Sequence, residues 1–283
     1  MPRAIDVHVH PPNPSGESLT SSKEAQQYFR TGSPPSSAQE VAEYYASLDM
    51  MAVVFDIDSE SATGRPPTPN DYFAGLMEQH PKQFIGFGSV DPWKGRAAVK
   101  EAERCAELGL RGLKFMPNMQ QFYPNEERFY PLWETAQALG LVVLLHTGTT
   151  GVGAGRPGGG GIKLKYSRPI PYVDDVAADF PDLKIIMAHP SWPWQEEQLA
   201  MLVHKPNVYM DLSGWSPKYF QPSLVQYAKT LIQDKVLFGS DYPVINPERW
   251  LSDFDGLGFP DNIRKKILLE NAAKLLGVSV EPA

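Results

Sequence analysis

The sequence predicts an α/β fold, a single (β/α)8 barrel of the TIM type. Two observations support it: short apolar segments alternate with helical ones along the whole chain, and 283 residues is the usual length for eight such repeats. The apolar segments are rich in Val, Ile, Leu and Phe, as is typical of parallel strands covered on both faces. They comprise residues 4–10, 50–57, 84–90, 110–115, 141–146, 183–188, 208–212 and 236–239. We therefore expect residues 1–283 to form one domain.

Helical periodicity fills the intervals between these strands. The predicted helices comprise residues 38–48, 72–79, 95–108, 129–139, 170–180, 194–205, 222–232, 261–269 and 271–276. Gly109 and Gly140 follow two of them, and glycine commonly ends a helix. The alternative is an open, doubly wound sheet. It is disfavoured because no Gly-x-Gly-x-x-Gly turn follows the first strand.

Two long loops interrupt the repeat, after the first and the fifth predicted strands. Residues 11–37 are polar and rich in Pro and Ser, whereas residues 148–169 are rich in Gly. Both would lie at the carboxyl ends of the strands, where barrel enzymes build their active sites. The second loop lacks the Gly-Lys-Ser/Thr ending of a P-loop. We therefore interpret it as a lid or a wall of the substrate site, with phosphate binding as the alternative.

Composition argues against several classes of function. The formal net charge is -7 and no block of Lys or Arg is present, which argues against nucleic-acid binding. No apolar stretch has the length of a membrane span, so no membrane partner is expected. Cys105 is the only cysteine, so no intrachain disulfide can form. Because the amino terminus also shows no signal-peptide pattern, a cytoplasmic location is expected.

Ionisable side chains stand where several predicted strands end. They are His8 and His10 on the first strand, then Lys114, His146, His189 and Asp241 on the fourth, fifth, sixth and eighth. Side chains alternate along a strand, so His8 and His10 share one face. The carboxyl ends of the strands meet at one mouth of the barrel, where unpaired imidazoles would be costly to bury. Imidazoles with a carboxylate suit zinc and similar divalent ions, so the sequence predicts a metal site.

Motifs at these positions are similar to those of the amidohydrolase superfamily. The His-x-His of the first strand, followed by His, His and Asp on strands five, six and eight, resembles that superfamily as a whole. Residues 188–191, 209–213, 237–243 and 270–276 resemble the branch named after aminocarboxymuconate semialdehyde decarboxylase. Their sequences are Ala-His-Pro-Ser, Tyr-Met-Asp-Leu-Ser, Leu-Phe-Gly-Ser-Asp-Tyr-Pro and Glu-Asn-Ala-Ala-Lys-Leu-Leu. The resemblance extends from residue 4 to about residue 277.

The resemblance implies one divalent metal, with zinc expected first and manganese or iron as alternatives. The implied ligands are His8, His10, His146 and Asp241. His189 would be the catalytic histidine beside a metal-bound water, and Asp241 would also relay a proton. In other branches a carboxylated lysine on strand four bridges two metals. Lys114 occupies a comparable position, so a second metal remains an alternative. A homodimer is also implied.

The branch contains hydrolases, decarboxylases and hydratases, so the resemblance leaves the reaction open. The first expectation is hydrolysis of a small anionic or aromatic carbonyl substrate by a metal-activated water, at an ester, a lactone or a β-keto carbon–carbon bond. The alternative is metal-dependent, nonoxidative decarboxylation of an aromatic or unsaturated carboxylic acid. A third option is a non-catalytic metal-binding subunit, against which the complete ligand set argues.

Residues that bind the substrate are expected on the loops around the barrel mouth. Arg156 and Arg168, with neighbouring lysines, give the Gly-rich loop a basic patch that suits an anionic substrate. Trp192 and Tyr242 follow the sixth and eighth strands, where aromatic side chains often line a substrate pocket. The alternatives are a solvated loop and packing between loops and helices.

Overall fold

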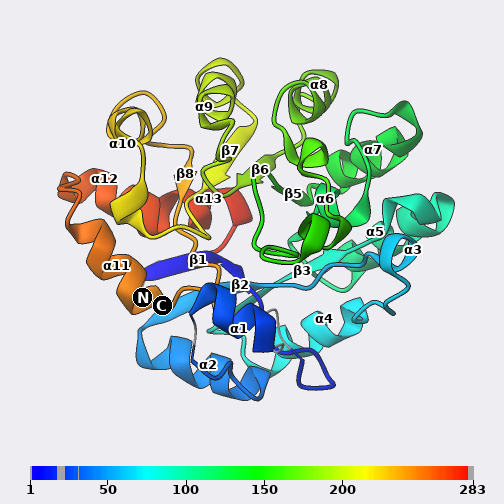
Figure 1. Cartoon of the computed structure of the whole chain (residues 1–283), viewed down its shortest axis with the longest axis horizontal. Coiled ribbons are helices and arrows are strands. Elements are labelled where there is room, and N and C mark those ends of the chain that lie inside the picture. The colour runs from blue at the N-terminus through cyan, green and yellow to red at the C-terminus, as the bar shows by residue number, and fades with distance from the viewer. Residues whose placement is uncertain (1, 18–22, 31, 280–283) are drawn as a thin grey trace.

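The computed structural model describes residues 2–17, 23–30 and 32–279. Eight parallel strands, ordered β1 to β8 as in the sequence, form the barrel that the sequence predicted (Figure 1). They are β1 (Ala4–Val9), β2 (Met50–Val54), β3 (Phe84–Ser89), β4 (Gly112–Phe115), β5 (Val142–His146), β6 (Ile185–Ala188), β7 (Val208–Asp211) and β8 (Val236–Leu237). The open, doubly wound alternative is therefore excluded.

The barrel closes between its first and last strands. The Val7 amide donates to the Phe238 carbonyl at 2.9 Å, and the Asp241 amide donates to the His8 carbonyl at 3.0 Å. One residue pair further, the His10 amide donates to the Tyr242 carbonyl at 2.8 Å. Because of this closure, the two ends of the chain contribute adjacent side chains to the barrel mouth.

Helices form a ring outside the strands (Figure 1). The α-helices are α1 (Lys23–Phe29), α2 (Ala38–Ser47), α3 (Glu60–Thr63), α4 (Asn70–Gln79), α5 (Arg96–Glu107), α6 (Pro117–Gln120), α7 (Tyr130–Leu139), α8 (Tyr172–Asp179), α9 (Gln195–His204), α10 (Pro222–Ala228), α11 (Pro247–Asp255), α12 (Asp261–Lys265) and α13 (Asn271–Leu276). A π-helical turn, η6 (Lys266–Glu270), joins α12 to α13. No helix among the described residues is long and apolar enough to cross a membrane.

Four described helices depart from the sequence prediction, namely the short α3 and α6, together with α1 and α11. Residues 11–37 were expected to be a loop throughout, but α1 lies within them; residues 18–22 and 31 of that segment fall outside the described residues. Helix α11 was not predicted at all, although Asn246 caps it by accepting a hydrogen bond from the Arg249 amide at 2.9 Å. Pro247 at its first position is a further helix-start signal that the sequence carried.

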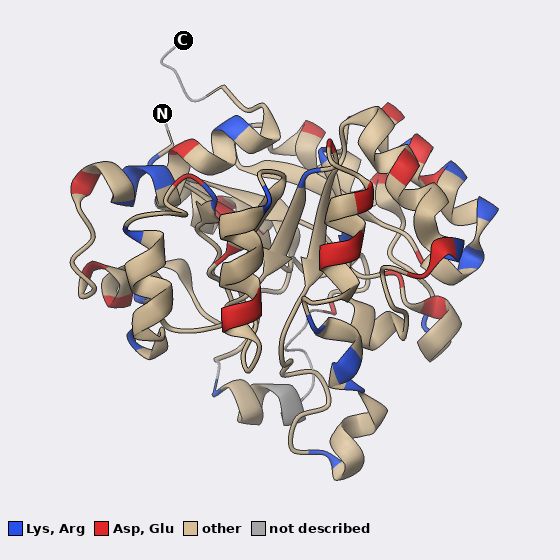
Figure 2. Cartoon of the chain, turned by 90° about the horizontal axis from the view of Figure 1, so that it is seen from above, with Lys and Arg blue, Asp and Glu red and all other residues tan. Residues whose placement is uncertain are grey.

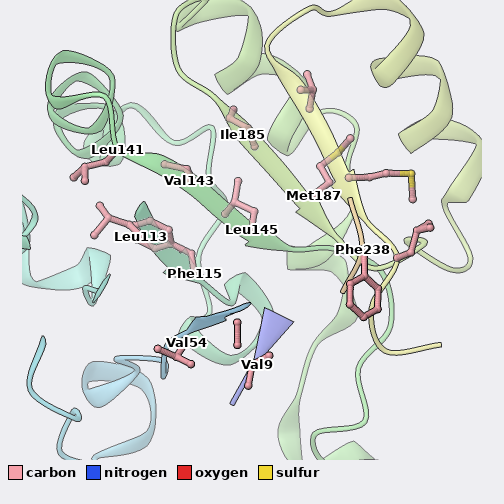
Figure 3. Close-up of a cluster of buried hydrophobic side chains, with 14 of the residues drawn as sticks. Val9, Val54, Leu113, Phe115, Leu141, Val143, Leu145, Ile185, Met187 and Phe238 are labelled. Carbon is pink, nitrogen blue, oxygen red and sulfur yellow. The ribbon is translucent and has the colours of Figure 1, made fainter. Parts of the chain in front are cut away.

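Apolar side chains form one layer inside the barrel and one between the strands and the helices. The outer layer includes Leu113, Phe115, Val143, Leu145, Ile185 and Met187 (Figure 3). The residues between them on the same strands, such as Leu144 and Ile186, pack inside the barrel. This alternation explains why the strands read as continuous apolar runs. The charged side chains lie mostly on the outer helices, with both signs interspersed (Figure 2).

A local irregularity in β1 turns two histidines toward the barrel interior. Val7 packs with the inner layer, so strict alternation would turn His8 outward. The pairing of β1 with β2 shifts register between Asp6 and Val9, as in a β-bulge. Beyond the shift, Val9 packs in the outer layer while His8 and His10 line the cavity at the mouth. The bulge thus sets which face the histidines occupy.

Candidate metal centre

Six ionisable side chains, which lie in or just after five of the strands, line one cavity of about 360 Å³ at the carboxyl ends of the strands. They are His8, His10, Lys114, His146, His189 and Asp241. All but His10 and Asp241 are less than 7% exposed. The predicted convergence of these residues on one site is therefore seen in the structure. Helix α1 and the Gly-rich loop after β5 also contribute to the walls of this cavity.

His8 is held so that one ring nitrogen faces the cavity. Its Nδ1 lies 3.0 Å from Oδ2 of Asp211. A carboxylate only accepts hydrogen bonds, so Nδ1 must carry the proton and Nε2 keeps its lone pair. Asp211 is itself fixed, because its Oδ1 accepts hydrogen bonds from the His189 and Ser213 amides, both at 3.0 Å. Asp211 therefore orients the imidazole without facing the cavity.

His146 and His189 form a second oriented chain. Nδ1 of His189 lies 3.1 Å from the Ser213 carbonyl, so it donates its proton there. Its Nε2 then accepts from Nδ1 of His146 at 3.0 Å. The remaining nitrogen, Nε2 of His146, is buried and has no hydrogen-bond partner among the residues described. A buried acceptor without a partner is costly unless something binds it.

These donors suit a divalent metal ion. Nε2 of His8 and Nε2 of His10 lie 3.4 and 3.3 Å from Oδ1 of Asp241. Two ligand atoms at about 2.05 Å from one tetrahedral ion are about 3.3 Å apart, so this spacing fits shared coordination. The unpartnered Nε2 of His146 lines the same cavity but is not part of this close group of three, so it is a candidate for a fourth ligand. The residues present therefore fit the metal that the sequence predicted.

A second group, His8, His189 and Asp211, also brings three potential ligands close together. Its atoms are already paired, since each Asp211 oxygen accepts a hydrogen bond from the protein. This group is therefore a hydrogen-bonded support of the site. The atoms of the group formed by His8, His10 and Asp241 face the cavity and contact mainly one another, so a metal ion could take the place of those contacts.

Burial keeps the imidazoles of His8, His146 and His189 neutral. It lowers the pKa of His8 to about 3, with repulsion from Lys114 acting in the same direction and attraction to Asp211 opposing it. Burial also lowers the pKa of His146 and of His189. A neutral imidazole has a lone pair for a metal ion. Near pH 7 all three rings are therefore in the form that can ligate.

The two charged side chains of the cavity respond differently to burial. Burial alone would raise the pKa of Asp241, but its hydrogen bond with His10 and the attraction of His8 and His189 hold that pKa well below its usual range. Burial lowers the pKa of Lys114 to about 8, against attraction to Asp211 and Asp241. The Lys114 ammonium lies 3.5 Å from Nε2 of His8 and over the Phe55 ring.

The metal-free protein is expected to lose stability as the pH falls from 6.5 toward 3. The pKa of His8 is about 3 in the folded protein against 6.5 ordinarily, so between these values only the unfolded chain binds the proton. His146 and His189 shift in the same direction. Asp6 acts in the opposite direction, because burial raises its pKa to about 7 and the folded protein therefore binds its proton more readily than the unfolded chain does. It contributes only one proton, against three from the histidines. Urea unfolding in chelator at several pH values measures the slope.

A His8→Gln variant should show a smaller loss of stability with falling pH than the wild type. A profile that is flat or that rises as the pH falls from 6.5 to 4 would contradict the lowered pKa of these histidines.

Gly214 allows the segment after β7 to approach His189 and Asp241 closely. Its φ is +74°, and a Cβ there would lie 2.8 Å from Nδ1 of His189 and 3.4 Å from Oδ2 of Asp241. We expect Gly214→Ala to lower kcat by roughly tenfold or more, because it displaces the His189 ring. Gly109 is the matched control, since its φ is +79° but a Cβ there meets nothing within 4 Å.

Both alanine variants carry the left-handed backbone cost of about 1–2 kcal/mol. Melting temperatures therefore report that shared cost, and only the difference in kcat reports the displaced ring. Equal kcat values for Gly214→Ala and Gly109→Ala would refute the positioning role.

The structure separates the four residues that the sequence assigned to substrate binding. Trp192 lines the cavity with the metal donors, and Arg156 lines an adjoining cavity. Arg168 lines neither, because its guanidinium binds the Glu197 carboxylate at 2.6 Å and its side chain is 47% exposed. Tyr242 packs against Tyr44, with ring centroids 5.4 Å apart, and also lies outside both cavities. Arg168 and Tyr242 therefore lie outside the two cavities, and a role for them in substrate binding stays a prediction.

Two supporting carboxylates had no role in the sequence prediction. Asp211 orients His8, as described above. Asp6 accepts hydrogen bonds from the His8 amide at 3.2 Å, the Ser240 amide at 2.9 Å and the Tyr45 hydroxyl at 2.7 Å, and so ties β1 to the segment after β8. A signal existed for Asp211, because it ends the seventh strand as the other site residues end theirs.

Known proteins resemble this chain in sequence. A model of a family described as amidohydrolase matches residues 5–278. Gamma-resorcylate decarboxylase from Polaromonas sp. (strain JS666 / ATCC BAA-500) is 25% identical over 281 residues, covering 81% of each protein. 2-Amino-3-carboxymuconate-6-semialdehyde decarboxylase from Dictyostelium discoideum is 31% identical over 78 residues, which is 27% of this chain and only 22% of that enzyme.

Solved structures share the fold. A TIM-barrel protein, Bb4693 from Bordetella bronchiseptica, superimposes with a TM-score of 0.80 and 24% identity, covering 97% of this chain and 98% of that one. A dihydroxybenzoic acid decarboxylase from Polaromonas sp. JS666, solved with bound manganese and 2-nitroresorcinol, has a TM-score of 0.66 and 20% identity and covers 98% of each chain. The family match spans nearly the whole barrel, including every candidate metal ligand, and the chain therefore belongs to the amidohydrolase family.

Proposed function

We propose that this chain is a metal-dependent decarboxylase that releases carbon dioxide, without oxidation, from an aromatic or unsaturated carboxylic acid. The observation that carries the proposal is the set of four candidate metal ligands in a cavity that also presents aromatic side chains, namely Tyr28, Phe29, Trp192 and Trp215. The two curated relatives are both decarboxylases, which supports this reaction. Hydrolysis, the first expectation from the sequence, has less support from these relatives.

A divalent metal held by His8, His10, His146 and Asp241 would act as a Lewis acid and orient the oxygen atoms of the substrate. The protein must then deliver one proton to the carbon that bears the carboxylate. That carbon keeps the electron pair of the breaking carbon–carbon bond and uses it to bind the proton, and carbon dioxide leaves. Aromatic side chains of the cavity would hold the ring in place and exclude water.

We assign the proton transfer to Asp241 acting as a relay, with His189 beside it: the ionised carboxylate would take a proton from water and pass it to the carbon. Oδ1 of Asp241 faces the two imidazoles, whereas its Oδ2 accepts no hydrogen bond from the described residues. Oδ2 of Asp241 and the ring of His189 both lie close to Gly214. One carboxylate thus offers one oxygen to the metal and the other to a proton.

The test uses the metal-loaded protein with 2,6-dihydroxybenzoate and related aromatic acids in labelled water. Decarboxylation predicts carbon dioxide in equal amount to the organic product, deuterium from D2O at the vacated carbon, and no oxygen-18 in the organic product. Oxygen-18 in the organic product without release of carbon dioxide would instead establish hydrolysis and refute the proposal.

We expect one metal per chain, with Lys114 unmodified. The four candidate ligands described above would serve a single ion, and the Lys114 amine adjoins only one of them, Nε2 of His8. Elemental analysis should give one equivalent, zinc or manganese, in the wild type and in Lys114→Met alike. Two equivalents, together with a mass increase equal to one carbon dioxide on Lys114, would show a bridged two-metal site.

A further inference from the structure

We propose that the substrate carries a second anionic group, remote from the carboxylate that is lost, and that Arg156 with Arg65 binds it in a cavity adjoining the metal site. This inference rests on the proposed function for the identity of the first carboxylate. It defines the substrate as an elongated dianion and assigns its specificity to the loops after β2 and β5.

The adjoining cavity borders the metal site. It has a volume of about 240 Å³ and shares part of its lining with the inner cavity, including His10, Phe29, Met116 and Gly151. A molecule that reaches the metal can therefore extend along the apolar side chains of Phe29 and Met116 into the outer space. A single-ring acid would occupy the inner cavity and leave the outer one to solvent.

Arg156 is a guanidinium without a counterion. It lines the outer cavity, and its guanidinium has no ion pair or hydrogen bond in the part of the chain that is described. Its backbone is fixed by the fold of the Gly-rich loop, because its amide donates to Gly153 at 3.2 Å and its carbonyl accepts from Gly159 at 2.9 Å. A Cβ on Gly153 would lie 2.1 Å from the Gly159 carbonyl oxygen, so only glycine permits this crossing.

Arg65 is only weakly paired in the same cavity. Its Nη2 lies 3.5 Å from Oδ2 of Asp56, which is long for a charged hydrogen bond. Asp56 has better partners, since it accepts from the Thr68 hydroxyl at 2.6 Å and from the Ile57 amide at 2.8 Å. The Arg65 side chain is 44% exposed and is therefore free to turn toward a ligand.

The metal end and the arginine end of the two cavities would bind different groups of one substrate molecule. The metal donors would place an acid at the inner end, while guanidinium groups bind carboxylate or phosphate by paired hydrogen bonds. Glu17, at the exposed rim of the outer cavity, and Asp56 are negatively charged and would repel an anionic group bound there. Replacing Glu17 with a neutral residue should therefore strengthen the binding of a dianion, whereas replacing an arginine should weaken it.

The test measures binding to the metal-loaded protein by calorimetry. The probes are benzoates with a para side chain of increasing length that ends in a carboxylate, in a phosphate or in a neutral amide. We expect one chain length at which an anionic end binds roughly tenfold tighter than the amide, the strength of a partly exposed charged pair. The preferred anion then distinguishes a dicarboxylate from a phosphorylated substrate.

Arg156→Met should abolish that preference and leave amide binding unchanged, while Arg156→Lys keeps part of it. Arg65→Met should reduce it, and Glu17→Gln should increase it. Arg168→Met is the matched control, since it removes an arginine of the same loop that lines neither cavity. Melting temperatures confirm that each variant is folded.

Equal binding of anionic and amide probes by the wild type, at every length, would overturn the inference. So would an anion preference that survives in Arg156→Met. Release of carbon dioxide is assayed separately. A preference for dianions without decarboxylation of any acid would refute the proposed reaction alone.

Discussion

A His10→Ala variant is expected to purify with less than about half an equivalent of metal and to lose activity by more than about a hundredfold, since even supporting residues of a metal site are worth that much. Nε2 of His10 lies 3.3 Å from Oδ1 of Asp241, so the alanine variant lacks one of the expected metal ligands. The ring is near the cavity surface, 8% exposed, and the Asp241 side chain that it contacts is 13% exposed, so solvent can reach the oxygen that loses its partner. The fold should therefore persist.

His204→Ala is the matched control for this variant. His204 ends α9 and is exposed, so its removal should change neither metal content nor activity. Elemental analysis, circular dichroism and a carbon dioxide assay on the three proteins complete the comparison. A His10→Ala protein that is both metal-replete and active would eliminate His10 as a ligand.

Much of the fold could be predicted because each strand is recognisable from its own sequence, without knowledge of its neighbours. Strands buried on both faces read as continuous apolar runs, and Gly109 and Gly140 mark helix ends in the sequence. Helix α1 was harder, because its local sequence is polar and it is fixed by a distant contact. A Cβ on Gly151 would lie 2.2 Å from the Phe29 ring, so α1 packs directly on the Gly-rich loop.

The site was predictable to the extent that barrel topology brings strand ends together. His146 ends β5, His8 lies next to the end of β1, and His189 and Asp241 follow β6 and β8, so the closed barrel makes the four neighbours. The supporting carboxylates were not predictable in this way. The role of Asp211 depends on which nitrogen of His8 it contacts, and that orientation follows from the bulge in β1.

The loop residues were the least predictable part of the site. Arg156 and Arg168 are both arginines of one glycine-rich segment, and nothing in their sequence context distinguishes them. The structure does, because Glu197 lies within 2.6 Å of Arg168 whereas no carboxylate pairs with Arg156 among the described residues. The ion pair of Arg168 with Glu197 on α9 therefore decides that Arg156, and not Arg168, is left to bind a ligand.

Asp241→Asn is expected to lower kcat by about 10²–10⁴-fold, the usual contribution of a positioned acid or base, while metal can still be loaded at excess. Asparagine keeps an oxygen that can face His8 and His10, but its amide nitrogen cannot carry a proton to carbon. The expected result is a folded, metal-loaded protein that binds the acid yet neither releases carbon dioxide nor incorporates deuterium from D2O.

Asp255→Asn is the control for Asp241→Asn, since Asp255 is 57% exposed and pairs with Arg264 on the outer helices. It should retain full activity. A metal-loaded Asp241→Asn protein with kcat within about tenfold of the wild type would contradict the assignment, because a positioned proton donor is worth more than that. In that case the proton must come from His189, the other titratable group beside Gly214, and His189→Asn would show the larger loss.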